Sequence, residues 1–404
     1  MQPQKTVTTI LLLTLAVAGV TPAVCMESSA SHAPASENPT AQDSGEGVLL
    51  FTVGIHIEPL RGQGTDQRDY NDKALFERHA EDVRILARIV ERYGGKLTVQ
   101  AQTPFTLVAA QSGETLFADL EGHGHEVALH FHEDAHLGRN SESLPVSVWA
   151  EAMAQEISYL HQAGATKVRY WSGGNLYLGI LEAASLAGLD VMSDWKNPRS
   201  QQTHTLVIGV NPWRPSGGPT DKDLSVFAQH DPQGKIIYLP DGEYDPEEFA
   251  RKRQLVRNGG GQAYFEFVKK SLERSLDAAQ PDRVNVFHFT IHPGEFRGDP
   301  ARPYAIVDRF LADVVHPLVK AGRVRWATFS QMADAFTQWE KTHPGIDPRR
   351  TETTRSASVD QMGLGRVERD LIYRTVDSVQ LKRGVRYPVP ANKPVPEVVY
   401  VHGG

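Results

Sequence analysis

Segments with strand-like and helix-like patterns alternate over about 300 residues of this chain, and this order restricts the fold most. Residues 53–58 alternate apolar and polar side chains with the period of two typical of a strand. Residues 74–93 then place apolar side chains at helical spacing. The same patterns predict strands at 97–101, 126–132, 167–171, 189–194, 206–210, 236–239, 284–292 and 324–329, and helices at 148–163, 177–187, 262–278, 303–320 and up to about Trp339.

Strands that alternate with helices in this number are typical of an α/β fold with a parallel sheet. We predict a distorted (β/α) barrel over residues 48–345. An open, doubly wound sheet is the alternative, because both folds share the same order of elements.

The two ends of the chain differ in composition from this central region. Lys5 and the apolar run 10–20 are typical of an export signal, which we expect to end at Ala23, so that 1–23 is a signal peptide. An uncleaved membrane anchor is the alternative. Residues 24–47 are rich in Ser, Ala, Glu and Pro and predict a flexible linker. Residues 346–404 are polar and then proline-rich, and predict a partly ordered tail.

The net charge and the cysteine content restrict which partners and which cellular compartment we expect for the protein. The net charge of −7 argues against nucleic acid as the main partner. Cys25 is the only cysteine, so no internal disulfide can form, and Val24 before it makes lipid attachment unexpected. We expect a secreted or periplasmic protein without stable membrane insertion after signal cleavage.

Five of the sixteen histidines fall between residues 123 and 136, and histidine is the commonest metal ligand. His123 and His125 precede the strand 126–132 and are expected in an exposed turn. His130 and His132 share one face at the end of that strand, where His136 follows in the loop.

Two other predicted strands also end in polar side chains on one face. Residues 53–58 end with His56 and Glu58, and residues 284–292 end with His292, with His288 deeper in the strand. Because the carboxyl ends of barrel strands meet at one face, we expect these groups to converge. Imidazole and carboxylate suit Zn²⁺ and related divalent ions. The candidate ligands are Glu58, His130, His132 and His136; a buried polar network without metal is the alternative, and His288 is expected to be a hydrogen-bonded lumen residue.

Further candidates for the site line the predicted strands at 167–171 and 189–194. Arg169 and Trp171 are expected to face the lumen, and Gly173 in the following loop would let the backbone approach a ligand. Asp194 and Trp195, at the end of the next predicted strand, are likewise expected to add a charged and an aromatic side chain to the site. The two tryptophans are candidates for stacking on a sugar face.

These residues, in this order, resemble the motifs of the polysaccharide deacetylase (NodB-homology) family of carbohydrate esterases. Residues 124–130 are similar to the motif that leads into the first metal-binding histidine, and 168–174 to the motif with an orienting arginine. Residues 190–195 and 289–293 are similar to the fourth and fifth motifs. The resemblance covers about residues 50–340 and implies a distorted barrel that binds a divalent metal and removes acetyl groups from polysaccharides.

The chain departs from the family pattern at the first and second motifs, and it also lacks the family's usual proline after the arginine of the third. The family's two adjacent aspartates, a base and a metal ligand, are here replaced by His56 and Glu58. The family's second metal histidine follows the first by four positions, which is Asp134 counted from His130 but His136 counted from His132. The resemblance therefore leaves two ligand sets open, Glu58 with His130 and His132, or Glu58 with His132 and His136.

Together these observations predict an exported, metal-dependent hydrolase that deacetylates a polysaccharide or glycan. His56 or Glu58 would act as the base and His292 as the general acid, with Arg169 and Asp194 as orienting groups. One alternative is a catalytically inactive barrel that binds glycan. Another is a metal-dependent hydrolase that acts on a different C–N or C–C bond.

Overall fold

The computed structural model describes residues 45–59, 69–138, 140–173, 177–196, 203–220, 222–256 and 260–349, and the backbone of 364–376 and 379–388. The predicted signal peptide, most of the predicted linker and Cys25 lie outside these residues. No helix among the described residues is long and apolar enough to cross a membrane.

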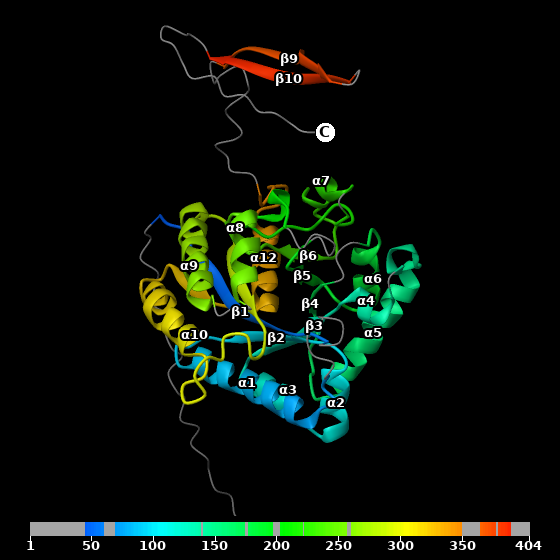
Figure 1. Cartoon of the computed structure of the whole chain (residues 1–404), viewed down its shortest axis with the longest axis vertical. Helices are drawn as coiled ribbons and strands as arrows, with labels where there is room; N and C mark the ends of the chain where they lie inside the picture. Colours follow the sequence, from blue (N-terminus) through cyan, green and yellow to red (C-terminus); the bar gives the residue numbers. More distant parts are fainter. Residues whose placement is uncertain are drawn as a thin grey trace, which may run out of the picture. The chain divides into compact units, whose positions relative to one another are not determined.

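Eight parallel strands form one curved sheet in the order β6-β5-β4-β3-β2-β1-β7, with β8 also paired to β1 (Figure 1). The strands are β1 (Leu49–Ile57), β2 (Leu97–Ala101), β3 (Glu126–His130), β4 (Tyr170–Ser172), β5 (Val191–Ser193), β6 (Ile237–Leu239), β7 (Asn285–Ile291) and β8 (Val324–Trp326).

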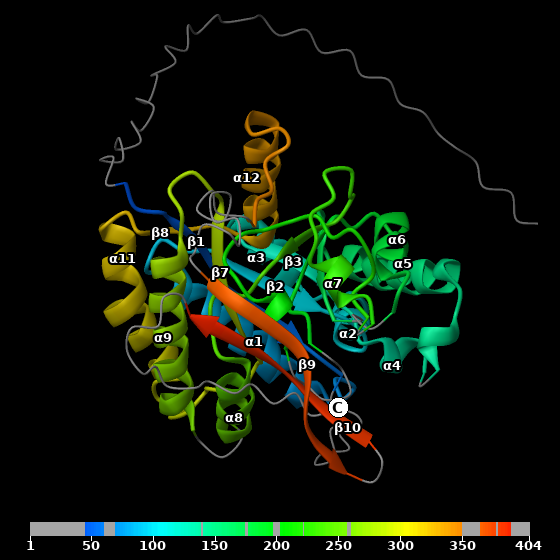
Figure 2. The ribbon, with the colours of Figure 1, turned by 90° about the horizontal axis from the view of Figure 1, so that it is seen from above.

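Helices lie around the outside of this sheet, as the two views show (Figures 1 and 2). The longer ones are α1 (Lys73–Glu91), α5 (Val146–Gln162), α8 (Pro246–Val256), α9 (Gly261–Ala278) and α12 (Phe329–Thr342). The shorter α-helices are α2 (Phe105–Ser112), α3 (Leu116–Gly122), α4 (Glu133–His136), α6 (Ile180–Leu186), α7 (Leu224–Phe227), α10 (Ala305–Phe310) and α11 (His316–Lys320). Two 3₁₀ turns, Ser141–Ser143 and Thr205–Val207, and a π-helical turn, Leu311–Val315, complete the set.

The edges of the sheet, β6 and β7, approach each other through irregular chain. The Val286 amide donates to the carbonyl oxygen of Val210 at 2.7 Å, and the His288 amide points to that of Asp241 at 3.5 Å. A regular ladder does not join the two edges, so the closure is distorted. The predicted distorted (β/α) barrel is thereby confirmed, and the open sheet is excluded. The prediction of a strand at 206–210 is wrong, because Thr205–Val207 form a 3₁₀ turn.

Strand β1 shows how the sequence pattern sets the two faces of the sheet. Leu49, Phe51, Val53, Ile55 and Ile57 belong to the large apolar core between the sheet and the outer helices. The alternate residues point into the barrel, where a Cβ at Gly54 would come within 2.8 Å of the Gln100 side chain. His56 is the last lumen residue of the strand, so the strand period of two carries its imidazole to the carboxyl end of the barrel.

Helix α12 closes the opposite, amino-terminal end of the barrel. Its apolar face packs on lumen residues in a second apolar cluster, and the Phe329 ring stacks on Tyr170 at 4.1 Å. Thr328 caps the helix in a capping box with Gln331. Glu126, buried at the base of β3, accepts hydrogen bonds from the Ser330 amide and from Thr98. Because this plug fills the lumen at the amino-terminal end, we expect a functional site at the carboxyl end of the strands.

We expect Thr328→Ala to lower the free energy of unfolding by about 1 kcal/mol, because the first turn of α12 loses its cap. Urea unfolding followed by circular dichroism measures the change. Thr328→Ser keeps a capping hydroxyl and is expected to stay close to the wild type. Equal losses in the two variants would contradict the role of the cap.

The region after the barrel contains a hairpin of β9 (Leu364–Val376) and β10 (Val379–Pro388), which pair antiparallel. The prediction of a partly ordered tail at 346–404 did not include these strands. The division of the chain into signal peptide, linker, barrel and tail stays a prediction.

Candidate metal centre

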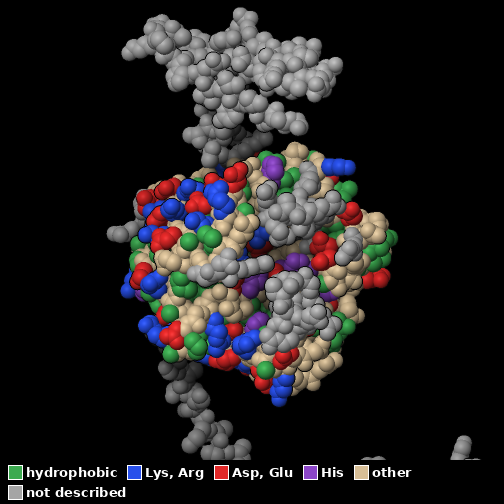
Figure 3. Space-filling view, in the orientation of Figure 1, with side chains coloured by type: hydrophobic (Ala, Val, Ile, Leu, Met, Phe, Trp, Pro, Cys, Tyr) green, Lys and Arg blue, Asp and Glu red, His purple; other side chains and the backbone are tan. Residues whose placement is uncertain are grey.

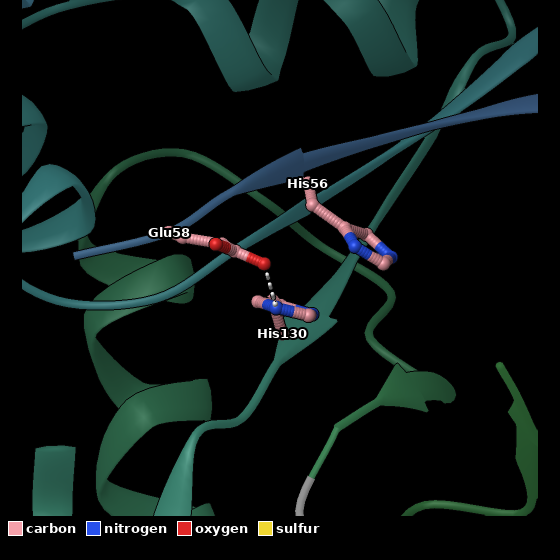
Figure 4. A group of neighbouring side chains, drawn as sticks. All are labelled: His56, Glu58 and His130. Atoms are coloured by element: carbon pink, nitrogen blue, oxygen red, sulfur yellow. Dashed lines mark hydrogen bonds and ion pairs between the residues drawn. The ribbon is translucent and has the colours of Figure 1, made fainter. Parts of the chain in front are cut away.

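Three imidazoles from the ends of two strands converge on one carboxylate oxygen from the end of a third, at the carboxyl end of the barrel. Glu58 Oε1 lies 3.3 Å from the Nε2 atoms of His130, His132 and His292. Figure 4 shows Glu58 pointing at His130, with the His56 ring beside them. Figure 3 shows histidine side chains gathered near the middle of this face of the molecule. The predicted convergence of β1, β3 and β7 is present in the structure.

The separation of each imidazole nitrogen from the Glu58 oxygen suits two neighbouring ligands of a small divalent ion. In a tetrahedral zinc site with bonds of about 2.0–2.2 Å, neighbouring ligand atoms lie about 3.3–3.6 Å apart. The three separations between the Glu58 oxygen and the imidazole nitrogens are each 3.3 Å. Among the described residues, the group that contains Glu58 and whose ligand atoms all lie within 4.8 Å of one another is His56, Glu58 and His130. The donor set, one carboxylate and imidazoles, is the type that holds Zn²⁺.

Partners outside the cluster orient two of the imidazoles. The Nδ1 atom of His130 lies 2.6 Å from Ser172 Oγ, and that of His292 lies 3.1 Å from Glu295 Oε2. Arg253 from α8 pairs with Glu295 at 2.7 Å. Such contacts fix which nitrogen faces a metal. Sequence reasoning missed Glu295 and Arg253; Glu295 could have been found from its position three residues after His292.

The charges in the cluster depend on burial and on Glu58. Burial, and then the nearby His56, hold the pKa of His130 well below its usual value, which favours the neutral, metal-binding form. Burial opposes ionisation of Glu58 too, but the charge of His292 and hydrogen bonds from the imidazoles hold its pKa well below the ordinary value. Burial would lower the pKa of His292, yet Glu58 and Glu295 raise it to about 9.

His56 lies two residues before Glu58 and has partners of its own. Its Nε2 lies 2.9 Å from Gln100 Oε1, 3.1 Å from Ser172 Oγ and 3.2 Å from Asp194 Oδ2. Its ring stacks on His130 at 4.1 Å. Burial would raise the pKa of Asp194, but the hydrogen bond with His56 holds it below its ordinary value. The structure thus pairs His56 with Asp194 beside the candidate metal site.

The structure does not bring His136 to Glu58. Residues 133–136 form the short helix α4, which turns the His136 ring onto Phe131 at 4.9 Å. Its Nε2 donates to Gln102 Oε1 at 2.6 Å, and its Nδ1 faces Glu156 at 3.4 Å. His136 is therefore not placed as a ligand. Asp134, which competed for that position, is 74% exposed and its oxygen lies 3.9 Å from His132 Nδ1.

We expect His136→Gln to keep the metal content of the wild type, whereas His132→Gln lowers it. Both variants remove one imidazole from the same short segment, but only His132 reaches Glu58. Zinc analysis after chelation and reloading measures the difference. A loss of metal in His136→Gln equal to that in His132→Gln would show that the loop closes over the ion in another arrangement.

The predicted stacking tryptophan, Trp171 on β4, and the predicted orienting arginine, Arg169 just before this strand, both face away from the lumen. In the parallel register, Trp171 pairs with Leu129 and Ser172 with His130, so Ser172 shares the lumen face and Trp171 does not. Trp171 is fully buried in the main apolar core. Arg169 pairs with Asp190 at 2.8 Å and Asp334 at 2.9 Å, not with Asp194. Both placements correct the prediction.

Trp195 and Gly173 are also placed differently from the expectation. Trp195 is buried, and its Nε1 donates to the Pro219 carbonyl oxygen at 2.8 Å. At Gly173 the close approach is to protein, because a Cβ would lie 2.4 Å from the Phe131 carbonyl oxygen, and its φ is +83°. Gly174 lies outside the described residues. Neither Trp195 nor Gly173 offers a surface to a sugar in this structure.

Asp194 reaches the lumen through an unusual backbone conformation. Ser193 pairs with Ser172 and takes the lumen face, so regular alternation would turn Asp194 outward. Its φ of +58° lies in the left-handed region, which Asp tolerates better than most residues, and this redirects the carboxylate to His56.

Two of the remaining histidines differ from expectation. His125 is buried, where its Nδ1 accepts from the Leu97 amide, while His123 is exposed as expected. His288 lies in the lumen as expected. Among the described residues, however, neither of its ring nitrogens has a hydrogen-bond partner.

Comparison with known proteins finds similarity in structure but not in sequence. No protein-family model and no curated protein matches the sequence. The structure is similar to a protein assigned as a polysaccharide deacetylase from Mycobacterium smegmatis, at 12% identity and a TM-score of 0.49 over 78% of this chain and 97% of that one. It is also similar to Puue allantoinase, at 17% identity and a TM-score of 0.49 over 77% and 96% of the two chains. A third, assigned as a polysaccharide deacetylase from Pseudomonas aeruginosa PAO1, has 17% identity and a TM-score of 0.47 over 74% and 92%. At these values the chemistry has to be argued from the side chains themselves.

Proposed function

We propose that this chain is a metal-dependent hydrolase that removes acetyl groups from a glycan. The observation that carries the proposal is the meeting of Glu58 with three imidazoles at 3.3 Å, at the end of the barrel where such folds place their active sites. We assign Glu58, His130 and His132 as the ligands and His292 as the proton donor. The motif order that resembles polysaccharide deacetylases supports acetyl groups as the target.

Each residue has a role that its contacts support. A bound Zn²⁺-like ion would polarise the acyl carbonyl and lower the pKa of a water molecule. His56 takes the proton of the attacking water, since Asp194 at 3.2 Å holds its Nε2 and leaves Nδ1 as the basic atom. His292 donates a proton to the departing amine or alcohol, and Glu295 keeps its ring in place. Ser172 orients the His130 ring.

The alternative of an inactive, glycan-binding barrel depended on Trp171 and Trp195 as a stacking surface. Both side chains are buried in the apolar core. The deacetylase proposal depends on neither. We also expect the protein to act after export, as the N-terminal residues predict.

Acetate release from acetylated glycans tests the proposal. The full chain is loaded with Zn²⁺ and assayed on chito-oligosaccharides, acetylated xylan and peptidoglycan fragments, next to a sample treated with chelator. We expect release that chelation abolishes and zinc restores, and that His56→Ala and His292→Ala each lower by at least about a hundredfold. Release by the chelated protein, or by both variants at the wild-type rate, would contradict the mechanism. Zinc-dependent hydrolysis of other amides without acetate release would favour a different C–N bond.

A further inference from the structure

A second group of potential metal ligands lies in the barrel lumen, separate from the Glu58 cluster. Donor atoms of Asp194, Asp241 and His288 lie within 4.8 Å of one another. His288 Nδ1 is 3.9 Å from Asp194 Oδ1, and His288 Nε2 is 3.5 Å from Asp241 Oδ1. The three residues come from the end of β5, the loop after β6 and the middle of β7. The barrel topology, and no sequence motif, brings them together.

His288 points into this group with its hydrogen-bonding capacity unused. The residue is only 2% exposed, and among the described residues neither ring nitrogen has a hydrogen-bond partner. Asp241 Oδ1 is likewise buried without such a partner there. Buried polar atoms are nearly always satisfied in folded proteins, so their convergence indicates a ligand between them.

The surroundings of the group favour a cation as that ligand. The Phe329 ring, at the start of α12, packs edge-on against the His288 ring with 4.6 Å between the ring centroids. This contact covers one side of the group. Tyr244 donates to Asp241 Oδ2 at 3.3 Å. Lys196 brings a positive charge near both carboxylates, yet the ligand oxygens of Asp194 and Asp241 lie within 4.8 Å of each other, where two carboxylates repel. A bound cation would relieve this repulsion between the two carboxylates.

We propose that Asp194, Asp241 and His288 bind a divalent cation, in a second site beside the one that contains Glu58. Two carboxylate oxygens and one imidazole nitrogen suit Zn²⁺ or Mn²⁺. Asp194 connects the two sites, because its Oδ2 faces His56 and its Oδ1 faces His288. This inference concerns metal content and does not depend on the acyl chemistry proposed above.

The metal content of the full chain tests the proposal. Protein stripped with chelator is dialysed against ZnCl₂ or, separately, MnCl₂, freed of unbound ion by gel filtration, and analysed by mass spectrometry of the metals. We expect about two ions per wild-type chain for at least one of the two metals, and about one for Asp241→Asn and for His288→Gln. His130→Ala is expected to lose the other ion and to keep this one.

Glu126→Gln is the matched control, because Glu126 is another buried lumen carboxylate whose oxygens already accept from Ser330 and Thr98. It is expected to keep the wild-type count, and thermal unfolding identifies any variant that has not folded. If Asp241→Asn and His288→Gln both bind as many metal ions per chain as the wild type, the second site is overturned. A single ion that only His130→Ala removes also overturns it, while leaving the Glu58 site intact.

Discussion

Replacement of His130 by alanine is expected to remove the metal ion that we propose at Glu58, and to lower kcat/KM by at least about a thousandfold. His130 is buried, and its Nε2 faces Glu58 while Ser172 holds the other ring nitrogen. A metal ion supplies several kcal/mol of transition-state stabilisation, and about 1.4 kcal/mol corresponds to a factor of ten in rate. Zinc analysis and acetate release on the same samples measure the two effects together.

A histidine from the same run provides the control for this prediction. The His123 side chain is 69% exposed, and its Nδ1 contacts Glu91 on α1, away from Glu58. We expect His123→Ala to keep both metal and activity. Ser172→Ala should fall between the two variants, since loss of a residue that orients a ligand costs about 10–100-fold in metal affinity or activity. Equal effects of His123→Ala and His130→Ala would show that the whole run acts through folding.

Replacement of Trp171 by alanine is expected to destabilise the protein by about 3–5 kcal/mol, because it empties a large volume in a close-packed core. Its side chain is fully buried, and among the described residues its Nε1 has no hydrogen-bond partner. Urea unfolding measures the loss of stability.

Trp171→Phe separates packing from recognition. It keeps an aromatic ring and removes the unpaired N–H, so we expect a clearly smaller loss of stability than in Trp171→Ala. Glycan affinity should stay unchanged in any variant that remains folded. Loss of glycan binding with unchanged stability would restore the earlier interpretation of Trp171 as a stacking surface.

Long strands and long helices could be predicted because the apolar pattern of each repeats several times along its length. The helix 74–93 corresponds to α1, and the strand at 53–58 corresponds to the second half of β1. Both faces of β1 followed from its alternation. β4 has three residues, too few for its own pattern to show which face is inward. Its orientation follows from its register with β3, so Arg169 and Trp171 were assigned to the wrong face.

The residues of the candidate site that lie at strand ends could be predicted from the sequence. Glu58, His130, His132 and His292 stood out because strand periodicity carries them to one end of a barrel. Arg253 did not, because it lies on α8 and reaches Glu295 only through the fold. The sequence pattern also gave no reason to connect His288 with Asp241, because Asp241 follows a three-residue strand without alternation of its own.

The sequence by itself determined the kind of fold and the types of side chain at the candidate site, because periodicity and residue type are local properties. Only the tertiary structure decided which imidazoles share the Glu58 oxygen, and it separated His136 from them. Metal binding depends on distances of a few ångströms between atoms from distant strands. Those distances are set by strand register, by the closure of the barrel and by the redirected backbone at Asp194, none of which a local pattern contains.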